Sequence, residues 1–270
     1  MIGEEMHGWA RDLFPICRSL TGNGTRESLA YLREIVPGME LHEVPSGTQA
    51  MDWVVPDEWN IKGAYIENEA GERLVDFAEN NLHVVGYSEP VDGIFTLAEL
   101  EPRLHSLPDR PNTIPYVTSY YNRDWGFCLT QAMRDKMKAG RYHCVIDSTL
   151  GPGSLTYGEL VLPGESSSEI FLSTYVCHPS MGNNELSGPI VTAALARSLA
   201  AQTDRRYGIR IVFIPETIGS IVYLSCHLDH LKKNVIAGFN ITCTGDERAW
   251  SYLPSRRGDT LADRVAQHVL

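Results

Sequence analysis

The 270-residue sequence has no long hydrophobic run, no extended basic segment and no clustered cysteines. No apolar stretch approaches the ~20 residues of a membrane-spanning helix, so we expect no membrane partner. The longest basic runs are Lys232-Lys233 and Arg256-Arg257, and the formal net charge is −11. Nucleic-acid binders present a basic surface, so we expect no nucleic-acid partner.

The cysteines stand singly, without a CxxC pair and without a signal peptide before them. They are Cys17, Cys128, Cys144, Cys177, Cys226 and Cys243. This pattern predicts buried, reduced thiols in a cytoplasmic protein. The remaining composition, 43% hydrophobic and 21% charged, is that of a soluble globular chain with an ample core. The length allows one large domain, or one domain that carries an insertion.

The most informative stretch of the sequence has the pattern of a strand, a loop and a helix. Ile170 to Cys177 is apolar and rich in β-branched and aromatic residues, which predicts a buried strand. His178 to Gly188 is a polar loop, and the Ala-rich segment from Pro189 to Leu199 predicts a helix with proline in its first turn. In α/β folds such loops lie at the carboxyl edge of the sheet, where sites form.

The loop offers two groups that suit a metal ion, His178 and Glu185, seven residues apart. Imidazole nitrogen and carboxylate oxygen are common zinc ligands, and the intervening proline and glycine let the chain bend. The alternative is that His178 bonds to loop backbone while Glu185 or Asn184 caps the next helix. Spacing alone leaves both interpretations open.

Two more apolar runs downstream, Gly208 to Ile214 and Val235 to Thr244, predict further buried strands that alternate with helices. An acid follows each run. Because the carboxyl ends of parallel strands meet at one edge, we expect one site or a set of solvated loops there. The candidate groups are His178, Glu185, Glu216 and Asp246.

Between residues 49 and 149 the sequence pattern changes. Short β-like runs, such as GAYIEN and YHCVID, are separated by turn residues. This predicts a small β-rich domain, 49–149, inserted into an α/β domain formed by 1–48 and 150–270. An inserted domain leaves and re-enters its host at neighbouring points, so Gln49 and Thr149 are expected close together.

Four longer motifs make the chain similar to one bacterial family. They are RSLTGNGTRESL, YYNRDWGFCL, CHPSMGNNELSGP and GDERAWSYLPSR. Together they resemble the aminopeptidase-like proteins of the DUF4910/DUF2172 group, relatives of the zinc-dependent M28 peptidases that are often described as polysaccharide-biosynthesis proteins. The resemblance implies a three-layer α/β fold with a largely parallel, mixed sheet of zinc-peptidase type, and a DUF2172-like insert. It also implies that a C-terminal part, with the last metal His, is missing here.

The resemblance implies hydrolysis of an amide or peptide bond in a small amino-acyl or peptide-like substrate. Glu216 would be the general base, Arg18 and Arg248 would receive a substrate carboxylate, and the cofactor would be one or two zinc ions. The implied metal ligands are His178, Glu185 and Asp246.

The alternative is a non-catalytic binding or scaffold relative that has lost metal ligands. Asn183 stands where the M28 peptidases have a bridging aspartate, and Thr242 stands near the position of their next acidic ligand. An incomplete ligand set predicts weak zinc binding by this chain. The apolar face of the predicted helix from Thr260 to Leu270 lacks a partner, so a homo-oligomer is also expected.

Overall fold

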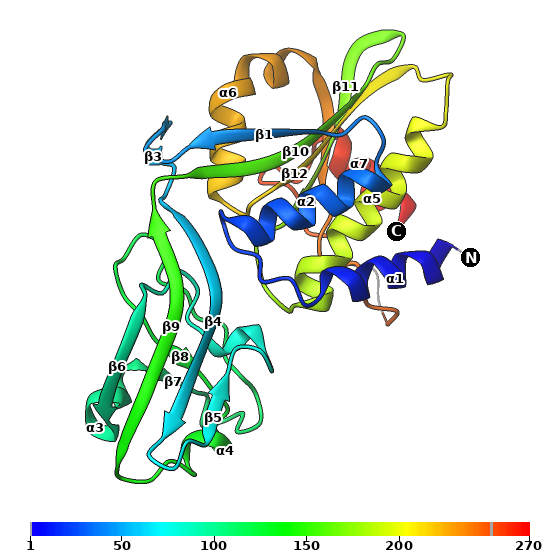
Figure 1. Cartoon of the computed structure of the whole chain (residues 1–270). Helices are drawn as coiled ribbons and strands as arrows, with labels where there is room; N and C mark the ends of the chain where they lie inside the picture. Colours follow the sequence, from blue (N-terminus) through cyan, green and yellow to red (C-terminus); the bar gives the residue numbers. More distant parts are fainter. Residues whose placement is uncertain (1, 249–250) are drawn as a thin grey trace. The chain divides into compact units, whose positions relative to one another are not determined.

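The computed structural model describes residues 2–248 and 251–270, and the chain divides into two compact units (Figure 1). One unit combines Met1–Val55 with Ser154–Leu270, and the other is Pro56–Gly153. The sequence pattern predicts an insert over 49–149, but residues 49–54 form a hairpin, β2 (Gln49–Ala50) and β3 (Trp53–Val54), within the first unit. Short β runs look alike in sequence, whichever unit they belong to.

The first unit contains a five-stranded mixed sheet in the order β1-β10-β12-β11-β13. Its strands are β1 (Glu40–Pro45), β10 (Ser154–Leu162), β11 (Ser166–Tyr175), β12 (Tyr207–Ile214) and β13 (Val235–Asn240). The pairings β1–β10 and β10–β12 are antiparallel, whereas β11 pairs in parallel with both β12 and β13. The predicted α/β fold with a mixed sheet is confirmed.

One face of this sheet carries the main hydrophobic core. It is covered by α1 (Ile2–Leu13), α2 (Asn23–Ile35) and α5 (Ser187–Ala200), as Figure 1 shows. Alternate strand residues such as Leu160, Ile211 and Phe213 point into it and are at most 3% exposed. Each such side chain contributes about 1.5–3 kcal/mol through burial, which fixes the strand register.

The other face packs against α6 (Ile218–Asn234) through a charged network. Arg210 of β12 is 8% exposed and donates to Glu169 Oε2 at 2.8 Å and to Glu159 Oε1 at 2.5 Å. His230 of α6 lies 2.9 Å from Glu169 Oε1 through its Nε2. Because the buried guanidinium is paired on both sides, its charge is compensated, and removing one partner would leave an unpaired charge between α6 and the sheet.

The second unit is built on a four-stranded antiparallel sheet in the order β5-β4-β9-β6. Its strands are β4 (Glu58–Asn68), β5 (Arg73–Asp76), β6 (Val91–Thr96) and β9 (Arg141–Gly151). Glu58 pairs with Gly151, so the chain enters and leaves this unit on adjacent strands. Its shorter elements are η1 (Asn81–His83), α3 (Leu97–Leu100), η2 (Glu101–Arg103), β7 (Leu104–His105), β8 (Phe127–Cys128) and α4 (Gln131–Arg134).

The last helix of the first unit is α7 (Leu261–Val269). Thr260 and Asp263 form a capping box at its start. Leu261 and Val265 are 41% and 42% exposed, and the homo-oligomer expected from this apolar face remains a prediction. In the described residues, no helix is both long and apolar enough to span a membrane.

Candidate functional site

The loops that follow β11, β12 and β13 share an uncommon backbone feature. Each contains a non-glycine residue with positive φ: Ser180 at 46°, Thr217 at 59° and Cys243 at 51°. A positive φ at a β-branched residue such as Thr217 is strained, and strained backbone concentrates at functional sites. The carboxyl edge of the parallel strands therefore combines this strained backbone with the predicted site residues.

His178 and Glu185 meet at this edge. His178 follows the end of β11, and the chain turns back through a π-helical turn, η3 (Gly182–Leu186), which brings Glu185 Oε2 to 2.9 Å from His178 Nδ1. The Glu185 side chain is fully buried, and its Oε1 accepts a hydrogen bond from the backbone N–H of Cys177. Both oxygens of this carboxylate are therefore used to hold the loop and the imidazole.

Glu216 approaches the same imidazole from the opposite side. It stands two residues after the end of β12, and its Oε2 lies 3.2 Å from His178 Nε2. Its side chain is 51% exposed, whereas that of His178 is 9% exposed. The imidazole of His178 thus bridges a buried carboxylate, Glu185, and an exposed one, Glu216.

This arrangement requires a proton or a cation between His178 Nε2 and Glu216 Oε2. If Nδ1–H of His178 donates to Glu185, a neutral ring presents the lone pair of Nε2 to the Glu216 carboxylate. Two acceptors 3.2 Å apart repel each other unless a proton or a cation lies between them. Two ligand atoms of one tetrahedral zinc ion, with bonds of ~2.0–2.1 Å, lie about 3.3 Å apart. The spacing of His178 Nε2 and Glu216 Oε2 therefore fits a zinc ion.

Arg18, predicted to face the substrate, lies behind His178 in the protein interior. Its side chain is 1% exposed, and its Nε donates to the carbonyl oxygen of His178 at 3.0 Å and lies 3.5 Å from Glu185 Oε1. Its Nη1 donates to the carbonyl oxygen of Leu13 at 2.6 Å. Burial lowers the pKa of Arg18, and the nearby Glu185 carboxylate opposes that shift. A substrate carboxylate has no open path to this guanidinium, which contradicts the expected substrate-facing position.

Asp246 and Arg248 form a separate, exposed pair in the loop after β13. Arg248 Nη2 donates to Asp246 Oδ2 at 2.6 Å and holds the pKa of that carboxyl below its usual range. Asn183 connects this loop to the His178 loop, because its Oδ1 accepts a hydrogen bond from the N–H of Gly245 at 2.8 Å. These residues line a shallow hollow of about 400 Å³. Within the part of the chain that the structure describes, the hydrogen bonds of Asp246 are to Arg248, and none joins it to His178 or Glu185.

Gly188, the second residue of α5, is glycine for a steric reason. A Cβ at Gly188 would lie 2.5 Å from the carbonyl oxygen of Ile241 and 2.6 Å from Thr174 Oγ1. The start of α5 therefore passes directly against the ends of β11 and β13, and only glycine fits there. This close approach places the loop that carries Glu185 over the sheet edge.

Sequence reasoning missed one residue of this cluster, Cys177, which it treated as a core thiol. Its Sγ accepts a hydrogen bond from the backbone N–H of Glu216 at 3.2 Å and lies 3.4 Å from His178 Nδ1. Burial raises the pKa of the Cys177 thiol well above its ordinary value. Cys177, His178 and Glu185 each offer a metal-ligand atom within 4.8 Å of the others. Its position directly before His178 was the only signal in the sequence.

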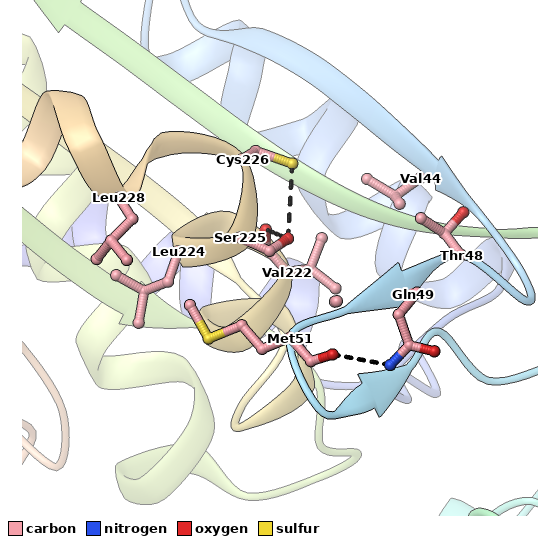
Figure 2. Close-up of a pocket in the computed structure, with 10 residues that line it drawn as sticks. Val44, Thr48, Gln49, Met51, Val222, Leu224, Ser225, Cys226 and Leu228 are labelled. Carbon is pink, nitrogen blue, oxygen red and sulfur yellow. Dashed lines mark hydrogen bonds between the residues drawn. The ribbon is translucent and has the colours of Figure 1, made fainter.

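A second hollow, of about 500 Å³, lies between the β2–β3 hairpin and α6 (Figure 2). Its lining is mixed: Val44, Met51, Val222 and Leu224 lie beside Thr48, Gln49 and Ser225. None of the predicted site residues lines it. The candidate site is therefore the His178 edge and not this larger hollow.

Comparisons with known proteins identify the family and the fold of this chain. The chain is 48% identical over 268 residues to a Clostridium acetobutylicum protein named for polysaccharide biosynthesis and an aminopeptidase-like domain. The matched region covers 99% of this chain and 61% of that protein. The crystal structure of a Clostridium acetobutylicum protein described as a putative peptidase, also 48% identical, superposes with a TM-score of 0.96 over 99% of this chain and 63% of that one. The chain thus spans about three fifths of the length of its curated relative.

More distant structures show the same fold. A zinc aminopeptidase from Bacillus subtilis superposes with a TM-score of 0.59 at 12% identity, over 94% of this chain and 74% of that one. The model of a domain of unknown function, DUF4910, matches residues 7–270. The fold is therefore aminopeptidase-like, and the chain belongs to the DUF4910 family.

Proposed function

We propose that this chain supplies part of a zinc-dependent site that hydrolyses an amide or peptide bond in a small amino-acyl conjugate. The observation that carries the proposal is the His178 imidazole, held at 2.9 Å by a buried carboxylate and at 3.2 Å by an exposed one. His178 Nε2 and Glu216 Oε2 would hold the ion, and Asp246 remains the candidate for a further ligand. Glu185, predicted as a ligand, would instead orient His178, because both of its oxygens accept hydrogen bonds within the loop. A zinc ion polarises a carbonyl and lowers the pKa of bound water toward ~7.

Glu216 is the residue suited to move a proton. Its side chain is half exposed at the sheet edge, so a water molecule can reach the carboxylate oxygen that does not face His178. In this role it takes a proton from the attacking water and passes it to the leaving amine, which contributes typically 10²–10⁴-fold to rate. The neighbouring Thr217, with its positive φ, turns the chain directly after Glu216 and keeps this carboxylate at the edge.

Glu185 and Arg18 serve as positioning residues in this proposal. Glu185 fixes the tautomer and orientation of His178 through Nδ1, an arrangement typical of histidines that bind metals. Arg18 holds the His178 carbonyl and balances the buried charge of Glu185. Arg248, whose side chain is 85% exposed, remains the candidate to receive a substrate carboxylate. Peptide-like substrates also agree with the aminopeptidase-like relatives.

The second candidate function is a non-catalytic binding or scaffold module. Asn183 and Thr242, which stand in place of acidic ligands, are engaged in structural hydrogen bonds: Asn183 with Gly245, and Thr242 Oγ1 with the Tyr175 hydroxyl at 2.6 Å. Such bonds hold the loops together without a metal ion. Zinc binding decides between the two functions.

The test is zinc titration by calorimetry on the chelator-treated chain, with aminoacyl p-nitroanilides as substrates for a parallel assay. We expect one weak zinc site that His178→Ala removes, and we expect Glu216→Gln to abolish whatever hydrolysis the chain shows. Glu34→Gln, a change of an exposed glutamate on α2, is the matched control and should alter neither measurement. Absence of zinc binding in the unchanged chain would favour the scaffold function.

A further inference from the structure

One buried cysteine, Cys177, contacts three residues of the proposed site: His178, Glu185 and Glu216. Cys177 is fully buried; its sulfur accepts the N–H of Glu216 at 3.2 Å and lies 3.4 Å from His178 Nδ1. Its own backbone N–H donates to Glu185 Oε1. A single residue thus links the ends of β11 and β12 and the loop that carries Glu185.

The backbone ladder between β11 and β12 ends before Glu216, so the amide of Glu216 needs a side-chain acceptor. The parallel ladder between β11 and β12 ends with the N–H of Val176 donating to the carbonyl of Ile214 at 2.9 Å. The next residue after Ile214 is Pro215, which has no N–H to donate, so Glu216 has the first amide beyond the ladder. The sulfur of Cys177 accepts that amide and extends the link between the two chains by one further bond.

We infer that Cys177 is a positioning residue of the site: its sulfur fixes the backbone of Glu216 and thereby the distance between Glu216 Oε2 and His178 Nε2. The inference rests on the proposed function for its purpose, but the sulfur–amide bond can be tested without metal or substrate. Because Glu216 precedes the strained Thr217, freeing its amide lets the start of α6 relax and moves the carboxylate away from His178.

The experiment compares Cys177→Ala with Cys144→Ala, since Cys144 of β9 is equally buried but lies in the second unit. In the metal-free chain, ¹⁵N NMR follows the Glu216 amide and the His178 ring nitrogens. For Cys177→Ala we expect a shifted Glu216 amide whose hydrogen exchange is at least tenfold faster. Zinc affinity should fall about 10–100-fold, as is typical when groups that orient ligands are lost. Cys144→Ala should change neither quantity by more than about twofold.

Cys177→Ser provides a second variant that keeps an acceptor in place. The C–O bond of serine is shorter than the C–S bond of cysteine, so the serine oxygen lies farther from the Glu216 amide and accepts a weaker hydrogen bond. We therefore expect a shift of the Glu216 amide between those of the wild type and Cys177→Ala, and a smaller loss of zinc affinity. An unchanged Glu216 amide in both Cys177 variants would overturn the inference. So would a thiolate-to-cobalt charge-transfer band in the cobalt-substituted chain, because the sulfur would then be a ligand itself.

The two proposals fail in different ways. If the unchanged chain binds no zinc, the proposed function fails, while the Glu216 amide in the metal-free variants still decides the role of Cys177. If zinc binds but Cys177→Ala leaves both the amide and the affinity unchanged, only the positioning role fails.

Discussion

The loops after β11 and β13 follow neighbouring strands of one sheet, yet the charged pair at the first loop is buried and the pair at the second is exposed. Glu185 in the β11 loop, and Arg18, which contacts this loop from the segment between α1 and α2, are completely buried and have backbone hydrogen-bond partners. Asp246 and Arg248, at the β13 loop, pair with each other across two residues, with side chains 29% and 85% exposed. The first pair has a fixed geometry that water does not screen, and the second is screened and adaptable. Orientation of His178 therefore depends on the first pair, and the second is free to meet a ligand.

The sharpest way to break this comparison is Arg18→Met. This change leaves the Glu185 carboxylate buried without its cation, which costs about 3–5 kcal/mol in the free energy of unfolding. Urea denaturation measures it. The double change with Glu185→Gln should recover part of the loss, because the unpaired charge is then gone. If Arg18→Met lowered the free energy of unfolding by only about 0–1 kcal/mol, as expected for an exposed ion pair, the buried pair would have no special role.

A second prediction concerns zinc affinity at the two loops. His178→Ala should weaken zinc binding at least tenfold, or about 1.4 kcal/mol. The change removes a zinc ligand that Glu185 orients, while Glu185 itself stays in place. Asp246→Asn should change the affinity less, since its carboxylate is already paired with Arg248. Calorimetry with zinc alone measures both variants. If both variants lost the same zinc affinity, Asp246 would be a zinc ligand as important as His178, and the predicted difference between the two loops would be wrong.

The third prediction uses pH on the segment beyond the β13 loop. Hydrogen bonds from Ser255, Thr260 and Tyr252 hold the pKa of Asp263 well below its usual range. A carboxyl whose folded pKa is lowered contributes stability that is fully present above its unfolded value of ~3.9 and is lost progressively as pH falls from there toward the folded value. We expect the difference between thermal melts of the wild type and Asp263→Asn to be largest and constant at neutral pH, and to narrow steadily as pH falls below about 4. Parallel melting curves at all pH values would contradict this prediction.

The smallest effect is expected for Arg248→Met. Because this guanidinium is largely solvent-exposed, its removal should leave the denaturation midpoint unchanged within error. The same variant should raise KM for substrates with a free carboxylate if Arg248 contacts them, and Arg257→Met, at another exposed arginine, is the control. A clear loss of stability would mean that the two loops differ less than their exposure indicates.

Much of the fold follows from patterns along the chain. The apolar runs of β11, β12 and β13 predicted buried strands because strand and helix periodicities are local properties. Their alternation with helices predicted a sheet with parallel strands, and hence an edge shared by His178 and Glu216. The start of the second unit was harder to place, because the β2–β3 hairpin has the same short β pattern as the strands after it but pairs within the first unit.

Local patterns determined which groups reach the sheet edge, but only the tertiary structure decided what each of them contacts. Arg18 is 160 residues away from the His178 carbonyl that it binds, and nothing near Arg18 in sequence indicates a buried position. Likewise, the contact of Cys177 with the Glu216 amide exists because β11 and β12 end side by side at Pro215. Residue type and spacing along one segment determine its own conformation, whereas burial and charge pairing depend on which distant segments pack against it.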